Sequence, residues 1–161
     1  CKGVCFPRTT QDVSTIMQWC HKHQQEVVVH GGLTNLVGST QTKPDQLVVS
    51  LEKMNAIDPV DNRNRTIAAQ AGAVLENVLN AVQQEQFFLP LSFGARGSAQ
   101  VGGIISTNAG GLRVFRYGMT RNWVLGLEVV LPDGTIIENL KNLRKDNSGV
   151  DLKQLFIGLL E

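Results

Sequence analysis

A glycine-rich stretch at residues 94–111 constrains the fold of this chain more than any other feature. Six of its eighteen residues are glycine, a density that a regular packed helix or strand does not tolerate. Each glycine removes a Cβ atom and permits positive φ, so successive N–H groups can converge on an anion. Ser98, Ser106, Thr107 and Asn108 add short hydrogen-bonding side chains. The stretch predicts a double turn that wraps around a ligand, and the alternative is a set of tight turns in an antiparallel sheet.

Another glycine loop, at residues 30–38, follows a buried strand that is predicted at 27–29, so it is the first glycine loop along the chain and the stretch at 94–111 is the second. In open α/β sheets ligands bind at the carboxyl ends of the strands, so this loop is well placed for a phosphate group. It lacks the G-x-G-x-x-G pattern of Rossmann dinucleotide sites and the Gly-Lys-Ser/Thr pattern of P-loops. The two glycine loops therefore point to a phosphate-containing ligand that is held by neither of those two folds.

Hydrophobic periodicity and turn residues predict an α+β fold of two lobes. The first lobe, about residues 1–52, is expected to be a small parallel βαβ unit, because a helix capped by Thr9 or Thr10 joins two buried strands. The second lobe, about residues 53–158, is expected to be mainly an antiparallel sheet with helices. Residues 159–161 resemble a cloning-derived tail, and the chain is expected to be a fragment. Strands are expected at 3–6, 27–29, 47–51, 65–71, 125–131 and 135–140, and helices at 10–20, 73–86 and 151–157.

The charge balance argues against two classes of partner. The chain has 15 lysines and arginines against 14 acidic residues and no block of like charge, so neither a nucleic-acid footprint nor a membrane-binding stripe is visible. No apolar run approaches the ~20 residues that span a bilayer. Cys1, Cys5 and Cys20 lack the spacing of a metal site and favour reduced thiols, which suggests a cytoplasmic location. A small-molecule partner is therefore expected.

The histidines and the central arginines form no recognisable catalytic arrangement. His21 and His23 fall at the end of a helix, where they are expected to lie on the surface. Arg113 and Arg116 fit salt bridges and the binding of an anionic cofactor equally well. No triad, carboxylate pair or metal cluster is visible in the sequence, so no catalytic or metal-binding residue is assigned.

With both glycine loops in view, the chain resembles the FAD-binding domain of the vanillyl-alcohol-oxidase or p-cresol-methylhydroxylase (PCMH) type of flavoproteins. The similarity is strongest in six blocks, at residues 30–38, 97–103, 107–113, 116–118, 124–134 and 144–149. Within that family the chain looks most similar to the D-2-hydroxyglutarate and D-lactate dehydrogenase branch, on account of its Arg-Lys-Asp-Asn-x-Gly sequence. The resemblance implies that FAD lies between the lobes and that a D-2-hydroxy acid loses hydride from C2 to flavin N5. Because a fold does not determine a reaction, the alternatives are a glycolate oxidase subunit, a reductase of cell-wall enolpyruvyl sugar nucleotides and a cofactor-free binding module.

The same resemblance implies which residues contact FAD. They are Gly31, Gly32, Leu33, Thr34, Asn35, Leu36, Gly38, Pro90, Gly94, Gly97, Ser98, Val101, Gly102, Gly103, Thr107, Asn108, Gly110, Gly111 and Tyr117. Relatives that attach FAD covalently carry histidine directly after the Gly-Gly pair, whereas Leu33 stands there in this chain, so non-covalent FAD is expected. Valine at Gly32 or Gly102 is expected to abolish FAD binding without unfolding the chain, because a branched side chain would occupy the space of the pyrophosphate. In the family, the base and the carboxylate-binding residues belong to a later C-terminal substrate domain, so this chain alone is expected to be inactive, and its electron acceptor is not identified.

Overall fold

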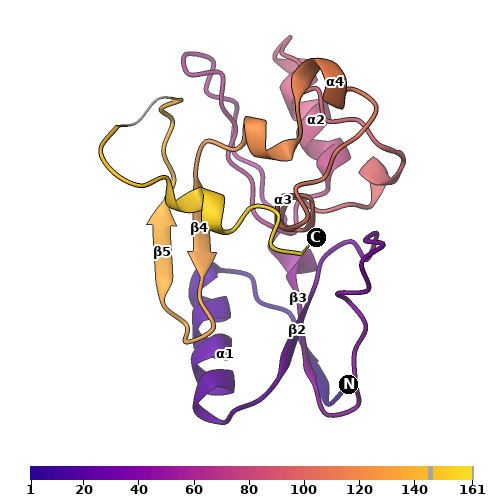
Figure 1. Cartoon of the computed structure of the whole chain (residues 1–161), viewed down its shortest axis with the longest axis vertical. Coiled ribbons are helices and arrows are strands. Elements are labelled where there is room, and N and C mark those ends of the chain that lie inside the picture. Colours follow the sequence, from indigo (N-terminus) through magenta and orange to yellow (C-terminus); the bar gives the residue numbers. More distant parts are fainter. Residues whose placement is uncertain (145–146, 161) are drawn as a thin grey trace.

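A small parallel sheet forms one end of the molecule in the computed structural model, which describes residues 1–144 and 147–160. Its strands are β1 (Gly3–Cys5), β2 (Val27–His30) and β3 (Leu47–Ser50), in the order β1-β3-β2. Both outer strands are parallel to β3, with Val48 of β3 opposite Val4 and Val28. The expected parallel βαβ unit is confirmed, and β3 lies between its two strands (Figure 1).

Helix α1 (Thr10–Lys22) begins at a capping box. The Thr9 hydroxyl accepts a hydrogen bond from the backbone N–H of Asp12, and the Asp12 carboxylate accepts from the backbone N–H groups of Arg8 and Thr9. The pKa of Asp12 is lowered below its usual range, mainly by the hydrogen bond from the Arg8 N–H and further by the Thr9 hydroxyl and the Thr9 N–H. The stabilising contribution of the cap is therefore present at neutral pH and is lost as the pH falls through that lowered pKa.

The middle of the chain packs around α2 (Leu75–Gln84), α3 (Val101–Ser106) and α4 (Val114–Tyr117). One core cluster joins α2 to α3 through four buried residues, Leu75, Leu91, Ala99 and Ile104. A second cluster, on another side of α2, consists of Ala73, Val78 and Val82. Burial of these side chains stabilises the lobe because apolar area leaves water at roughly 25 cal/mol per Å². Among the residues that the structure describes, no helix is long and apolar enough to cross a membrane.

Two expected elements are wrong. Residues 65–71 form no strand but only isolated bridges, with Asp61 paired to Thr66 and Ile57 paired to Ala69, and Arg65 has a φ of 55° that interrupts extended backbone. The helix expected at 151–157 is a 3-10 turn at Leu152–Leu155. In both places the apolar pattern was correct, but the backbone hydrogen bonds of a regular element do not form.

The antiparallel part of the fold is the hairpin of β4 (Leu127–Val130) and β5 (Ile136–Asn139), as expected. The hairpin packs against α1 of the first lobe (Figure 1). The buried Ser14 hydroxyl donates to the Gly134 carbonyl at 2.6 Å, and Gly134 has a φ of 86° in the turn. The α+β class is confirmed.

The C-terminal segment returns to α3 and to the turn before β4. The Arg121 guanidinium donates to the side chain of Gln154 and to the carbonyl of Ile157, which is itself buried. The N–H groups of Gly158 and Leu160 then donate to the carbonyls at the end of α3. The lobe boundary at about residue 52 and the tail at 159–161 remain predictions, and Glu161 lies outside the described residues.

Candidate functional site

The structure brings the two glycine loops together. Gly32 lies so close to the second loop that a Cβ atom on it would be 1.9 Å from the carbonyl oxygen of Ser98. Gly31 lies beside the side chain of Gln100, with an ideal Cβ 3.4 Å from Oε1. Two segments almost seventy residues apart therefore form one surface, at the carboxyl end of β2.

The first loop has backbone donors to offer. Within the described protein, the N–H groups of residues 32–38 donate no hydrogen bond to another protein group. Side chains hold the loop in place, since His30 Nε2 lies 3.0 Å from the Thr40 carbonyl and the Asn35 amide donates to the Thr40 hydroxyl at 3.2 Å. The His30 ring thus forms a hydrogen bond within the loop, as its position on the strand side of the turn indicates. A run of free N–H groups on a fixed loop is suited to an anion.

Two buried acceptors in the same region have no partner among the described residues. They are the side-chain oxygens of Asn35 and Gln100. A buried polar atom without a partner is costly, at about 1–3 kcal/mol, and such an atom needs an explanation. FAD carries hydroxyl and N–H donors beside its diphosphate, so these residues fit that cofactor. Gln100 was missed by sequence reasoning, and its signal was a large polar residue between Ala99 and Val101 in a run of small and apolar residues.

The second glycine stretch contains a helix that was not expected. α3 starts within it, and its first N–H groups are used by the protein: Val101 donates to Ala73 and Gly102 to Ala71. A Cβ on Gly102 would be 2.9 Å from the Cβ of Ala71. Gly103 differs, because a Cβ there would meet nothing within 4 Å and its N–H donates to no described group. Gly102 therefore lets α3 pack closely against Ala71, whereas the space around Gly103 is left open.

The residues that follow α3 also divide into packing and open positions. A Cβ on Gly111 would be 2.1 Å from the Ser92 carbonyl oxygen. Thr107 donates its hydroxyl to the Gly103 carbonyl, and the Asn108 side chain accepts from the Arg121 N–H, so both organise the turn. Gly94 is open, with nothing within 4 Å of an ideal Cβ. The remaining predicted contacts are placed as follows: Leu33, Thr34, Leu36, Gly38, Gly97, Ser98 and Gly110 are exposed and Pro90 is buried.

Leu33 has a strained backbone. Its φ is 55°, in the left-handed region that costs a side-chain-bearing residue about 1–2 kcal/mol, and its side chain is 59% exposed. We expect Leu33→Gly to raise the free energy of unfolding by up to ~1 kcal/mol, measured by urea denaturation, because glycine accepts this φ without strain. Leu36→Gly is the matched control, since Leu36 is exposed in the same loop without positive φ and should gain nothing. Equal effects of the two substitutions would contradict the assignment of strain to Leu33.

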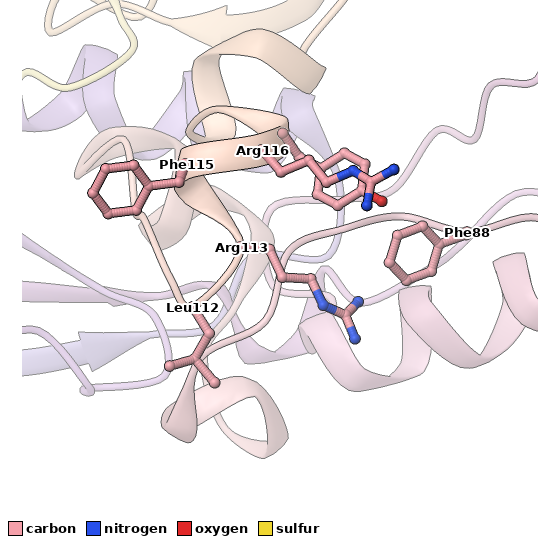
Figure 2. A pocket seen from close by; sticks show the side chains of 6 residues that line it. Phe88, Leu112, Arg113, Phe115 and Arg116 are labelled. Carbon is pink, nitrogen blue, oxygen red and sulfur yellow. The ribbon is translucent and has the colours of Figure 1, made fainter.

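Tyr117 lies in a separate hollow of about 440 Å³ (Figure 2). The hollow is lined by Phe88, Leu112, Arg113, Phe115, Arg116 and Tyr117. The Arg113 guanidinium lies 4.7 Å from the centre of the Phe88 ring, and that of Arg116 lies 5.3 Å from the centre of the Tyr117 ring. Neither arginine forms a salt bridge among the described residues. The structure thus shows these arginines stacked on aromatic rings and, among the described residues, not in the salt bridges that were one of their two expected roles; the binding of an anionic cofactor stays a prediction.

The remaining reactive side chains do not assemble into a site. Within the described part of the chain no group of three histidine, cysteine, aspartate or glutamate residues could hold a metal ion. His21 and His23 are exposed, as expected, and the His23 ring stacks on Trp19 with the ring centres 4.4 Å apart. Cys20 is buried, and burial raises the pKa of its thiol. Lys145 and Asp146 of the Arg-Lys-Asp-Asn-x-Gly block lie outside the described residues.

Comparison with known proteins identifies the class. Residues 1–139 match the FAD binding domain family, and the chain belongs to that family, with FAD as its cofactor. Solved structures with the same fold include alkyldihydroxyacetonephosphate synthase, with a TM-score of 0.83 and 22% identity over 98% of this chain and 28% of that one. The grass pollen allergen Phl p 4, described as having glucose dehydrogenase activity, has a TM-score of 0.80 and 22% identity over 96% of this chain and 31% of the other. The resemblance to vanillyl-alcohol-oxidase and PCMH-type flavoproteins is confirmed.

Curated relatives place the chain within that class. It is 48% identical to the D-2-hydroxyglutarate dehydrogenase of Danio rerio over 94% of this chain and 28% of the relative. The enzyme of the same name from Bos taurus is 48% identical over 98% of this chain and 29% of the relative. The D-2-hydroxyglutarate–pyruvate transhydrogenase of Saccharomyces cerevisiae is 45% identical over 96% of this chain and 31% of the relative. The predicted branch of the family is confirmed, and the chain spans less than a third of the length of these relatives.

The expected cytoplasmic location is contradicted by these comparisons. The relatives from Danio rerio and Bos taurus are both named as mitochondrial proteins. The expectation rested on three cysteines, which form no disulfide in the structure. Free thiols indicate only that the environment is reducing, so they do not distinguish one reducing compartment of the cell from another.

Proposed function

We propose that the chain is the FAD-binding part of an oxidoreductase that oxidises a D-2-hydroxy acid of the 2-hydroxyglutarate or lactate type. The observation that carries the proposal is the loop at residues 32–38, whose backbone N–H groups donate to no described residue and which lies against Ser98 of the second glycine stretch. Its similarity to D-2-hydroxyglutarate dehydrogenases supports the substrate class. The residues that would bind and deprotonate the acid are assigned to the part of the protein that corresponds to the rest of those relatives.

In this proposal the loop N–H groups bind the diphosphate of FAD. These N–H groups can donate to a negative group without first breaking a hydrogen bond to the protein, since they donate to none of the described residues. The side-chain oxygens of Asn35 and Gln100 accept from hydroxyl or N–H groups of the cofactor, which removes the cost of two buried acceptors without partners. Gly94 and Gly103 leave room for it, whereas Gly32, Gly102 and Gly111 act by letting chain segments approach each other. Bound FAD supplies the acceptor for the hydride from C2 of the acid.

We infer that FAD is bound without a covalent link to this chain. The position after the Gly-Gly pair is Leu33, which has no nucleophilic atom, and the His30 imidazole is engaged with the Thr40 carbonyl. Acid precipitation of the FAD-loaded protein should therefore release the flavin into the supernatant, where its absorbance is measured. A yellow pellet would show a covalent bond.

The reaction is tested by mixing the complete FAD-loaded protein, including the part that corresponds to the rest of those relatives, anaerobically with D-2-hydroxyglutarate, D-lactate or glycolate, because this chain alone is expected to be inactive. We expect either D-acid to bleach the flavin absorbance and the corresponding L-acid to leave it unchanged. Bleaching by glycolate alone would replace this proposal with the glycolate oxidase alternative. A protein that folds but does not bind FAD would support a binding module that has lost its cofactor.

A further inference from the structure

The hollow beside α4 shares no lining residue with the first glycine loop or with residues 94–103, and its chemistry is distinct. Its wall combines two guanidinium groups with aromatic rings. In Figure 2, Arg113 and Arg116 extend toward the side where Phe88 lies, while Phe115 points the other way. The rings of Phe88 and Tyr117 meet edge to face, with their centres 5.9 Å apart. The arginines and the two rings thus form one continuous surface.

The sequence around the hollow carries positive charge only. From Gln86 to Leu127 there is no aspartate or glutamate. The charged residues in this range are four arginines, at positions 96, 113, 116 and 121. Local charge balance therefore has to come from another part of the chain or from a ligand.

Two of the four arginines have structural partners. Arg96 lies 3.4 Å from the Glu76 carboxylate, and Arg121 donates to the C-terminal segment at Gln154. The guanidinium groups of Arg113 and Arg116 have neither an ion pair nor a hydrogen-bond partner among the described residues. Of the four arginines, the two whose guanidinium groups have no partner among the described residues are the two that line the hollow.

Stacking orients these two guanidinium groups without using their donors. A guanidinium that lies over an aromatic ring keeps its N–H groups around its edge, where they can pair with a carboxylate or phosphate in bidentate geometry. The rings offer apolar faces and edges to a flat group in the same space. A hollow of about 440 Å³ is within the range of small-molecule sites, roughly 300–1,000 Å³.

We propose that this hollow binds a planar anion of nucleotide size, meaning an aromatic ring that carries phosphate or carboxylate groups. The anionic group pairs with Arg113 and Arg116, and the ring packs against Phe88 and Tyr117. This site is separate from the proposed FAD site at the two glycine loops, so in this proposal Tyr117 contacts the new ligand in place of FAD. The proposal does not rest on the oxidation of a hydroxy acid.

The test uses the FAD-loaded protein and calorimetric titration with three probes. ADP presents both a ring and phosphates, adenosine presents the ring alone, and pyrophosphate presents the anion alone. We expect ADP to bind at about one per chain, with adenosine and pyrophosphate each weaker by about tenfold or more, because each lacks one class of contact. No binding of ADP, or equal binding of ADP and pyrophosphate, would overturn the proposal.

Substitutions in the hollow locate the site. Arg113→Gln and Arg116→Gln should each weaken ADP binding about tenfold, since each removes a charged hydrogen-bonding partner. Phe88→Leu should weaken ADP while leaving pyrophosphate unchanged. Arg8→Gln is the matched control, because Arg8 is exposed before α1 and does not line the hollow. ADP affinity equal to that of the wild type in all three hollow variants would overturn the proposal.

Flavin absorbance, measured while ADP is added, shows whether ADP binds in the hollow or displaces FAD. Since FAD contains an ADP half, release of flavin by ADP, or loss of flavin from Arg113→Gln, would show that the arginines serve the cofactor and would overturn the separate site. Retained flavin with one ADP bound supports it. A failure of the protein to load FAD would instead count against the proposed FAD site. ADP titration of the flavin-free wild type beside Arg113→Gln and Phe88→Leu would then test the hollow, since equal ADP affinity in all three would overturn the proposal.

Discussion

Gly32→Val is expected to destabilise the folded chain by about 3 kcal/mol or more, the upper range for overpacked sites. The new Cβ would lie 1.9 Å from the carbonyl oxygen and 2.8 Å from the carbonyl carbon of Ser98. Both are backbone atoms of the second glycine loop, so relief requires one loop to move away from the other. Urea denaturation followed by circular dichroism measures the loss. The sequence-based expectation of a folded chain that merely fails to bind FAD is replaced by this one.

Gly31→Ala is the control for that experiment. Its Cβ would meet the end of the Gln100 side chain at 3.4 Å, an ordinary contact with a flexible group. We therefore expect a change below about 1 kcal/mol. An unfolding midpoint for Gly32→Val equal to that of Gly31→Ala would show that the two loops are not packed as described.

Gly103→Val should leave the chain folded and weaken FAD binding by about a hundredfold, which corresponds to a loss of ~3 kcal/mol of binding free energy. Gly103 is exposed, an ideal Cβ meets nothing within 4 Å, and its N–H has no acceptor among the described residues. A valine side chain would therefore fill space that the protein leaves open on α3, a few residues after Ser98 and Gln100, which lie against the first glycine loop. Titration with FAD, followed by flavin fluorescence, measures the affinity, and circular dichroism confirms the fold.

The neighbouring glycine provides the contrast. Gly102→Val should lower the free energy of unfolding, because its Cβ would be 2.9 Å from the Cβ of Ala71. The two adjacent substitutions thus separate stability from affinity. FAD affinity equal to that of the wild type in a folded Gly103→Val protein would remove this part of α3 from the proposed site.

Local sequence signals predicted the first lobe well, because its elements are determined by local chemistry. Short continuous runs of valine define β2 and β3, and the Thr9 cap defines the start of α1. The strand expected at 65–71 failed for the opposite reason. Its residues had the right apolar pattern, but a turn with Arg65 at positive φ leaves them paired only through isolated bridges.

The candidate site was predicted in outline and missed in detail. Glycine density located both loops, and the structure brings them together at Gly32 and Ser98. The glycine pattern could not reveal α3, a helix of six residues whose first N–H groups donate to the carbonyls of Ala71 and Ala73. Nor could it show which glycines face a ligand, because that depends on which distant carbonyl lies beside each one. Gln100 became a candidate only when its buried oxygen proved to have no partner among the described residues.

The contact between the β4–β5 hairpin and α1 has a consequence for how the molecule could be divided. Ser14 and Gly134 are 120 positions apart, yet their buried hydrogen bond joins the first lobe to the last sheet of the chain. A gene cut at about residue 52 would leave α1 with an uncovered face in one product and the hairpin with an uncovered face in the other. We therefore expect the two products to remain unstructured when expressed separately and to recover the fold only when mixed, as complementary halves of one cooperative unit.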